Sequence, residues 1–150
     1  MKLSLPAATS LTGWSERTLW RRFSDGTLMR ETVDGKSMLE FEALVPHLCV
    51  PIGPEEVALL ASADAGNAEA QNEVALFFLE HGRPKGAIYW LELAAKQNWA
   101  DSAHLLSQCY LQGAGVERNA NKGMVWLAKA AELGHVIAQR QMQGIYGKGT

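Results

Sequence analysis

The chain has 150 residues, of which 47% are hydrophobic and 20% are charged, and its formal net charge is −2. This composition is typical of a folded globular protein rather than a disordered one. The small negative charge argues against nucleic-acid binding over the whole surface, which needs a basic field. No apolar run approaches the roughly 20 residues that span a bilayer, and two cysteines are too few for a disulfide framework. We therefore expect a cytoplasmic protein of one ordinary domain or two small ones, without membrane attachment.

The N-terminal segment predicts two short helices separated by a turn. Ser4 is suited to cap a helix over residues 6–11, and Ser15 a helix over residues 16–23. Gly13 stands between them, where the chain can adopt the left-handed conformation that ends a helix.

A hairpin is expected to follow the two helices. Asp34-Gly35 is a strong signal for a tight turn, here between strands over residues 28–33 and 36–41. A further short helix over residues 42–48 should bend or end near Pro46.

The helix over residues 16–23 separates into a basic face and an apolar face. The basic face carries Arg17, Thr18, Arg21 and Arg22, and the apolar face carries Leu19, Trp20 and Phe23. This pattern fits a DNA-reading helix, a protein-docking module or a helix that exposes arginines only for solubility. The first 50 residues contain six basic and six acidic residues, so a DNA-binding surface would have to be local.

The C-terminal two-thirds contain an internal repeat. "YWLELAAKQN" from Tyr89 returns as "VWLAKAAELG" from Val125, 36 positions later, and "VALFFLEHG" from Val74 matches "LSQCYLQGAG" from Leu106 at a spacing of 32. The two spacings differ by four residues, and this difference lies in the loop between the two predicted helices of a unit. A helical pair cannot bury its apolar stripe alone, so neighbouring pairs must stack. We expect a short α–α solenoid over residues 57–150, with two full units and a half-unit at each end.

This pattern resembles the Sel1-like repeat, a relative of the tetratricopeptide repeat. The family turn is matched by Gly113, Gly115 and Val116, and its second helix by Lys122, Trp126, Lys129, Ala130, Ala131 and Gly134. The first unit departs from the family because it lacks the glycine turn. The resemblance implies protein–protein interaction through a concave face.

Positions that vary between units while their neighbours stay structural are candidates for that face. The candidates are two equivalent sets, Asn72, His104 and Arg140, and Glu80, Gln112 and Lys148. The alternative is that these side chains are merely solvated.

Helix, glycine turn, helix and two-stranded wing together resemble the winged helix-turn-helix of the MerR and excisionase group, over about residues 3–48. The resemblance implies that Arg17 and Thr18 meet base edges and that Arg21 and Arg22 bind phosphate or guanine. It also implies that Arg30 and Lys36 on the wing touch the flanking DNA backbone. Related regulators usually dimerise, so self-association is expected to raise affinity.

Nothing in the chain predicts catalysis. His47 and Cys49 are too few for a zinc site, the remaining histidines form no recognisable triad, and neither a metal nor another cofactor is expected.

The sequence predicts a mainly α protein with a small winged helix-turn-helix domain over residues 1–49, a linker over residues 50–56 and the repeat array. Its expected function is that of a bacterial-type DNA-binding regulator or adaptor that binds double-stranded DNA and a protein partner. The alternative is a non-enzymatic protein-interaction scaffold without DNA binding.

Overall fold

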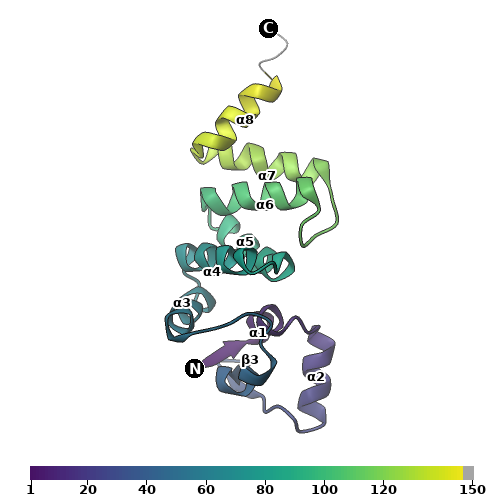
Figure 1. Ribbon diagram of the computed structural model, residues 1–150. Helices are drawn as coiled ribbons and strands as arrows, with labels where there is room; N and C mark the ends of the chain where they lie inside the picture. The colour runs from purple at the N-terminus through teal and green to yellow at the C-terminus, as the bar shows by residue number, and fades with distance from the viewer. Residues whose placement is uncertain (147–150) are drawn as a thin grey trace.

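The computed structural model describes residues 1–146, and it is mainly helical (Figure 1). The helices form a column, with the N-terminal module at one end and α8 at the other. None of the described helices is long and apolar enough to cross a bilayer. The elements in chain order are β1 (Lys2–Ser4), α1 (Leu5–Thr12), α2 (Glu16–Ser24), β2 (Glu31–Val33), β3 (Lys36–Glu40), the 3-10 helix η1 (Phe41–His47), α3 (Pro54–Asp64), α4 (Ala68–Glu80), α5 (Pro84–Lys96), α6 (Ala100–Gln112), α7 (Ala120–Glu132) and α8 (Val136–Tyr146).

The first two helices begin and end where local chemistry predicts. The Ser4 hydroxyl accepts a hydrogen bond from the backbone N–H of Ala7 at 3.3 Å, and that of Ser15 accepts one from Thr18 at 3.2 Å. Gly13 has a φ of 73° and its N–H donates to the Thr9 carbonyl, which ends α1. The two predicted helices and the turn at Gly13 are therefore present.

The N-terminal sheet has three antiparallel strands in the order β1-β3-β2. The predicted hairpin is present, and both of its turn residues, Asp34 and Gly35, have positive φ values of 52° and 78°, as a type I′ turn requires. Strand β1 was not predicted; it pairs with β3 so that Leu3 lies opposite Leu39. The helix expected over residues 42–48 is instead the 3-10 helix η1, which contains Pro46.

The junction between the N-terminal module and the repeats is tightly built. Helix α3 begins with Pro54 in its first turn, inside the predicted linker, and the Glu56 carboxylate accepts from the N–H of Gly53 at 3.0 Å. At the other end of α3, the Asp64 carboxylate accepts from the N–H and the hydroxyl of Ser4, at 2.9 and 2.6 Å. The N-terminal half-unit of the array thus rests on β1.

A second contact joins α1 to α5. The Trp90 side chain is fully buried, and its indole Nε1 donates to the Ser10 hydroxyl at 3.1 Å. One hydrophobic cluster runs from Leu3 in the sheet to Ala138 in α8. The N-terminal module and the repeats therefore share a core and form one unit.

Glycines permit close approach at two helix–helix contacts of the array. A Cβ on Gly86 in α5 would lie 2.6 Å from the ring of Phe78 in α4, and one on Gly123 in α7 would lie 2.6 Å from Leu111 in α6. Gly144 in α8 differs, because a Cβ there would meet nothing within 4 Å.

Alanine substitution should therefore have opposite effects at these glycines. We expect Gly86→Ala and Gly123→Ala each to lower the free energy of unfolding by about 1–3 kcal/mol, because overpacking outweighs the better helix propensity of alanine. Gly144→Ala should raise it by up to about 1 kcal/mol, since only propensity changes. Urea unfolding followed by circular dichroism measures all three. An increase in the free energy of unfolding for all three variants would show that the helices can accommodate a Cβ at Gly86 and Gly123.

Candidate interaction surfaces

The exposed face of α2 carries two of the arginines predicted to bind DNA. Arg17 and Arg21 are exposed and four residues apart, so they lie on one side of the helix. Neither forms an ion pair with any other residue of the segment 1–146. Lys36, at the start of β3, is also exposed and unpaired within that segment. These three cations are free to meet an anionic partner.

The other predicted DNA contacts have partners within the protein. The Arg22 guanidinium lies 4.1 Å from the centre of the Trp14 ring, and its Nε is buried without a hydrogen-bond partner among the described residues. Arg30 lies 4.8 Å from the Trp20 ring and donates to the Ser37 hydroxyl at 3.1 Å. These cation–π contacts join residues eight and ten positions apart, so periodicity alone gave no signal for them.

Thr18 is also engaged within the module. Its hydroxyl is 3.0 Å from that of Ser15, the residue that caps α2. The structure thus divides the predicted DNA-binding set into free cations and residues that hold the module together.

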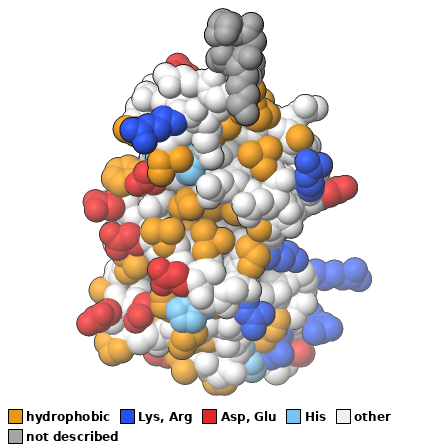
Figure 2. Space-filling view, turned by 45° about the horizontal axis from the view of Figure 1, so that its top comes forward, with side chains coloured by type: hydrophobic (Ala, Val, Ile, Leu, Met, Phe, Trp, Pro, Cys, Tyr) orange, Lys and Arg blue, Asp and Glu red, His pale blue; other side chains and the backbone are white. Residues whose placement is uncertain are grey.

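Charge is unevenly distributed over the surface. Figure 2 shows most of the Asp and Glu side chains in view along one edge of the molecule and most of the Lys and Arg side chains in view along the opposite edge. The net charge of −2 therefore conceals a separation of charge that could orient a partner.

Two residues predicted to face a partner are instead buried between helical pairs. Asn72 is 7% exposed and accepts from the Ser102 hydroxyl at 2.6 Å. His104 is 6% exposed, and its Nε2 lies 2.9 Å from the Gln141 side-chain oxygen. The prediction of partner contact is therefore wrong for these two, because their position in the repeat faces the next helical pair rather than solvent.

The remaining candidates are exposed or lie outside the described residues. Arg140, equivalent to Asn72 and His104, is exposed on α8. Gln112 is exposed at the end of α6, as is Glu80 at the end of α4. Lys148 lies outside the described residues. Arg140 and Gln112 thus stay candidates for partner binding.

A histidine pair joins α6, α7 and α8. The rings of His104 and His135 stack with centroids 4.2 Å apart, and His135 Nε2 lies 3.3 Å from an Asp101 carboxylate oxygen. His135 Nδ1 accepts from the N–H of Ala138 at 3.1 Å and so caps α8. Burial and the neighbouring His104 lower the pKa of His135, against the opposing effect of Asp101. The neutral ring is the form that caps the helix.

No metal-binding cluster is found in the described part of the chain: it holds no group of three or more His, Cys, Asp or Glu placed to bind an ion. His47 packs against Trp14, with ring centroids 4.8 Å apart. Cys109 is buried, and burial raises the pKa of its thiol. A protonated, buried thiol is a packing group rather than a nucleophile.

The histidine cap predicts a pH-dependent stability. The pKa of His135 is lower in the folded protein than in the unfolded chain. The stabilisation by its neutral ring is therefore complete above the unfolded-state pKa of about 6.5 and is lost as the pH falls through the folded-state pKa. His135→Asn should keep the cap, since Asn67 and Asn119 cap α4 and α7 in the same way. Because Asn does not titrate, this variant should lose less stability at the lower pH. Urea unfolding at pH 7.5 and 5.5 compares the two proteins. Equal losses of stability in both would contradict the role of His135.

Comparison with known proteins identifies the array. The Sel1 repeat family model matches residues 68–99 and 100–135, which are α4–α5 and α6–α7 with their following turns. The DAP3-binding cell death enhancer 1 of Rattus norvegicus is 30% identical over 90 residues, which are 59% of this chain and 18% of the rat protein.

A solved structure gives the same result at the level of the fold. The crystal structure of a Sel1 repeat protein from Oxalobacter formigenes matches 73% of this chain and 41% of its own, with a TM-score of 0.51 and 24% identity. This chain thus spans less than half the length of both relatives. The family match does not extend to the N-terminal module. The match to the Sel1 repeat model covers helices α4 to α7 of this chain.

Proposed function

We propose that this chain is a protein-interaction adaptor whose repeat array binds a partner by stacking a helix of that partner on α8. The observation that carries this proposal is the exposure of Arg140 at a repeat position that is buried in the two preceding units, at Asn72 and His104. In those units the position is covered by the next helical pair. On α8 the same position is open to solvent.

Exposed apolar side chains on α8 support this proposal. Val136 and Ile137, one turn before Arg140, are 58% and 56% exposed, and Ile145 is 49% exposed. The residue equivalent to Ile145 in α6 is Cys109, which is buried. Apolar side chains that remain exposed are available to a protein partner. A partner helix with an apolar stripe and a carboxylate opposite Arg140 would complete the stacking seen between the repeats.

The relatives support a function in protein–protein interaction. Sel1 repeats imply protein–protein interaction, and the rat relative is named for binding another protein, DAP3. The partner of this chain need not resemble DAP3, because the similarity covers only 18% of the rat protein.

Site-specific photo-crosslinking in the cells that make the protein tests the proposal. A photo-crosslinking amino acid at Ile145, whose equivalent Cys109 is buried in the array, should capture a partner, whereas the same group at Glu69, which is exposed on α4 beneath a stacked neighbour, should not. Arg140→Glu should lower the yield of the Ile145 adduct at least fivefold, because it places like charge opposite the partner's carboxylate. Lys96→Glu, on the exposed end of α5, is the control with the same change in charge.

Two results would overturn the proposal. Equal adducts from Ile145 and Glu69 would show that α8 does not bind a partner selectively. An adduct that joins two copies of this chain would replace the partner with a homodimer.

DNA binding by α2 is a second candidate function, favoured by the exposure of Arg17 and Arg21 without carboxylate partners within residues 1–146. In a winged helix-turn-helix of the MerR type, Arg17 at the start of the second helix would enter the major groove, and Arg21, one turn later, would bind phosphate or guanine. The free cations are few, so the module would need dimerisation or a partner to bind tightly at physiological salt.

Salt-dependent binding to a pool of genomic duplex fragments tests this candidate. If α2 reads DNA, Arg17→Ala/Arg21→Ala should lower the affinity at least tenfold and flatten its dependence on salt, because two cationic contacts are lost. Lys96→Ala/Arg140→Ala removes the same charge elsewhere and should bind as the unaltered protein does. Equal weakening in the two double variants would indicate a nonspecific charge effect and exclude α2 as the reading helix.

A further inference from the structure

We infer that the cleft between the N-terminal module and the first Sel1 repeat binds an extended, acidic peptide segment of a protein partner. This site is separate from the α8 surface and does not depend on it. The cleft has a volume of about 670 Å³, within the range of about 300–1,000 Å³ that is typical of ligand sites.

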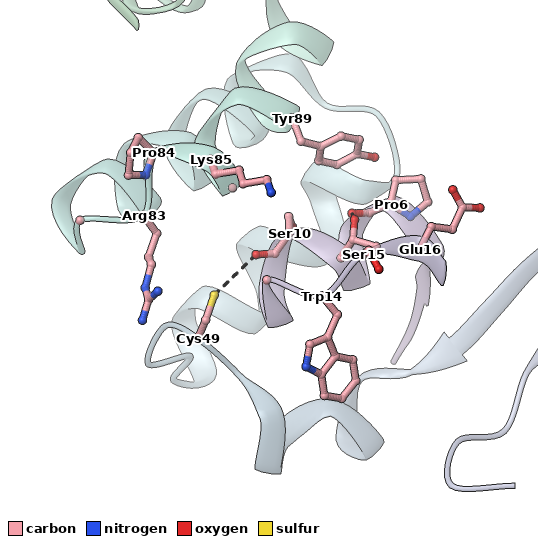
Figure 3. A pocket seen from close by; sticks show the side chains of 14 residues that line it. Pro6, Ser10, Trp14, Ser15, Glu16, Cys49, Arg83, Pro84, Lys85 and Tyr89 are labelled. Atoms are coloured by element: carbon pink, nitrogen blue, oxygen red, sulfur yellow. Dashed lines mark hydrogen bonds between the residues drawn. The ribbon is translucent and has the colours of Figure 1, made fainter. Parts of the chain in front are cut away.

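The two walls of the cleft come from different modules (Figure 3). The α1 side and the start of α2 contribute Pro6, Ser10, Ser15 and Glu16, and the opposite wall is the α4–α5 turn with the first two turns of α5. The shared core fixes the separation of the walls, because the Trp90–Ser10 hydrogen bond lies directly between α5 and α1. The cleft is therefore a preformed feature of the fold.

The charge of the cleft favours an acidic occupant. Arg83 and Lys85 line one wall, and both are exposed without a carboxylate partner among residues 1–146. Glu16 is the one acidic residue of the lining, and Figure 3 shows it at the end of the cleft away from Arg83. Carboxylates of the ligand would thus be drawn to the Arg83 end and repelled from the Glu16 end, which gives the bound segment a direction.

The cleft also has an apolar surface. Pro6, Pro84 and Tyr89 line it together with the basic residues. An extended peptide that alternates carboxylates with apolar side chains matches this combination.

A second basic surface lies on the loop that packs against one wall of the cleft. A Cβ on Gly115 would lie 2.5 Å from the Pro84 carbonyl, so the α6–α7 loop rests on the start of α5. The same loop and the start of α7 form a smaller pocket with Arg118 and Lys122. A peptide longer than the cleft would therefore meet further cations along the same edge.

An acidic peptide fits the cleft better than a nucleic acid does. Proteins that hold single strands stack bases on several aromatic rings along a continuous cationic groove. Here Tyr89 and Trp14 are the aromatic residues of the lining. The Trp14 ring is already packed against His47 and the Arg22 guanidinium, at 4.8 and 4.1 Å from its centre. Glu16 and Glu117 also interrupt the cations of the two pockets.

A selection experiment with the full chain tests the inference. Random 12-residue peptides displayed on their messenger RNA are selected for binding, and the enriched peptides are labelled with fluorescein for measurement of Kd by anisotropy. We expect enrichment in Asp and Glu with interspersed apolar residues. Arg83→Glu/Lys85→Glu should weaken binding at least tenfold. Lys96→Glu/Lys129→Glu makes the same change in net charge on α5 and α7, away from the cleft, and should change Kd less than twofold.

Cysteine labelling locates the bound peptide independently of these variants. Cys49 lines the cleft and is half-buried, whereas Cys109 is buried in the array. A bound peptide should slow alkylation of Cys49 and leave that of Cys109 unchanged.

Any of three results would overturn the inference. The first is a selection without acidic bias, and the second is a cleft variant that binds like its control. The third is stronger protection of Cys49 by a single- or double-stranded oligonucleotide than by the selected peptides at equal concentration, which would assign the cleft to nucleic acid.

Discussion

A helical pair in this protein has more apolar surface than it can bury between its own two helices, and the architecture follows from that constraint. The pair α6–α7 is covered by α5 on one side and α8 on the other. The pair α4–α5 is covered partly by α1, which buries Trp90 completely. Helix α8 packs on α7 and leaves Ile137 and Ile145 about half exposed. The need for burial that holds the array together therefore also determines where its surface is open.

Polar side chains between the pairs make the stacking specific. A buried amide or imidazole is costly unless it is hydrogen-bonded, and Asn72 and His104 each meet a polar side chain of the following helical pair. These bonds form only when the pairs are aligned so that donor meets acceptor. At the equivalent position of α8, Arg140 is charged and solvated. A cation there would favour a neighbour that offers a carboxylate over one that is wholly apolar.

The N-terminal module packs directly against the repeat array. The Asp64 carboxylate accepts two hydrogen bonds from Ser4, and Trp90 donates to Ser10. These contacts close one side of the junction and leave the cleft on the other. Arg22 is held against Trp14 inside the module, so its charge helps to hold α2 against the turn that precedes it, while Arg17 and Arg21 stay at the surface. Residues that look equivalent on one helical face thus have different roles.

The sequence by itself determined the features that depend on neighbouring residues: the caps at Ser4 and Ser15, the turn at Asp34-Gly35, and a repeat whose apolar spacing requires stacked helical pairs. Fewer features of the candidate sites could be predicted from the sequence. The free cations of α2 and the exposure of Arg140 could be anticipated, but the burial of Asn72 and His104 and the pairing of β1 could not. The cleft likewise combines Glu16 with Arg83, 67 positions apart. Tertiary structure decided these features because burial and charge pairing depend on which distant segments pack together, and local periodicity carries no information about that.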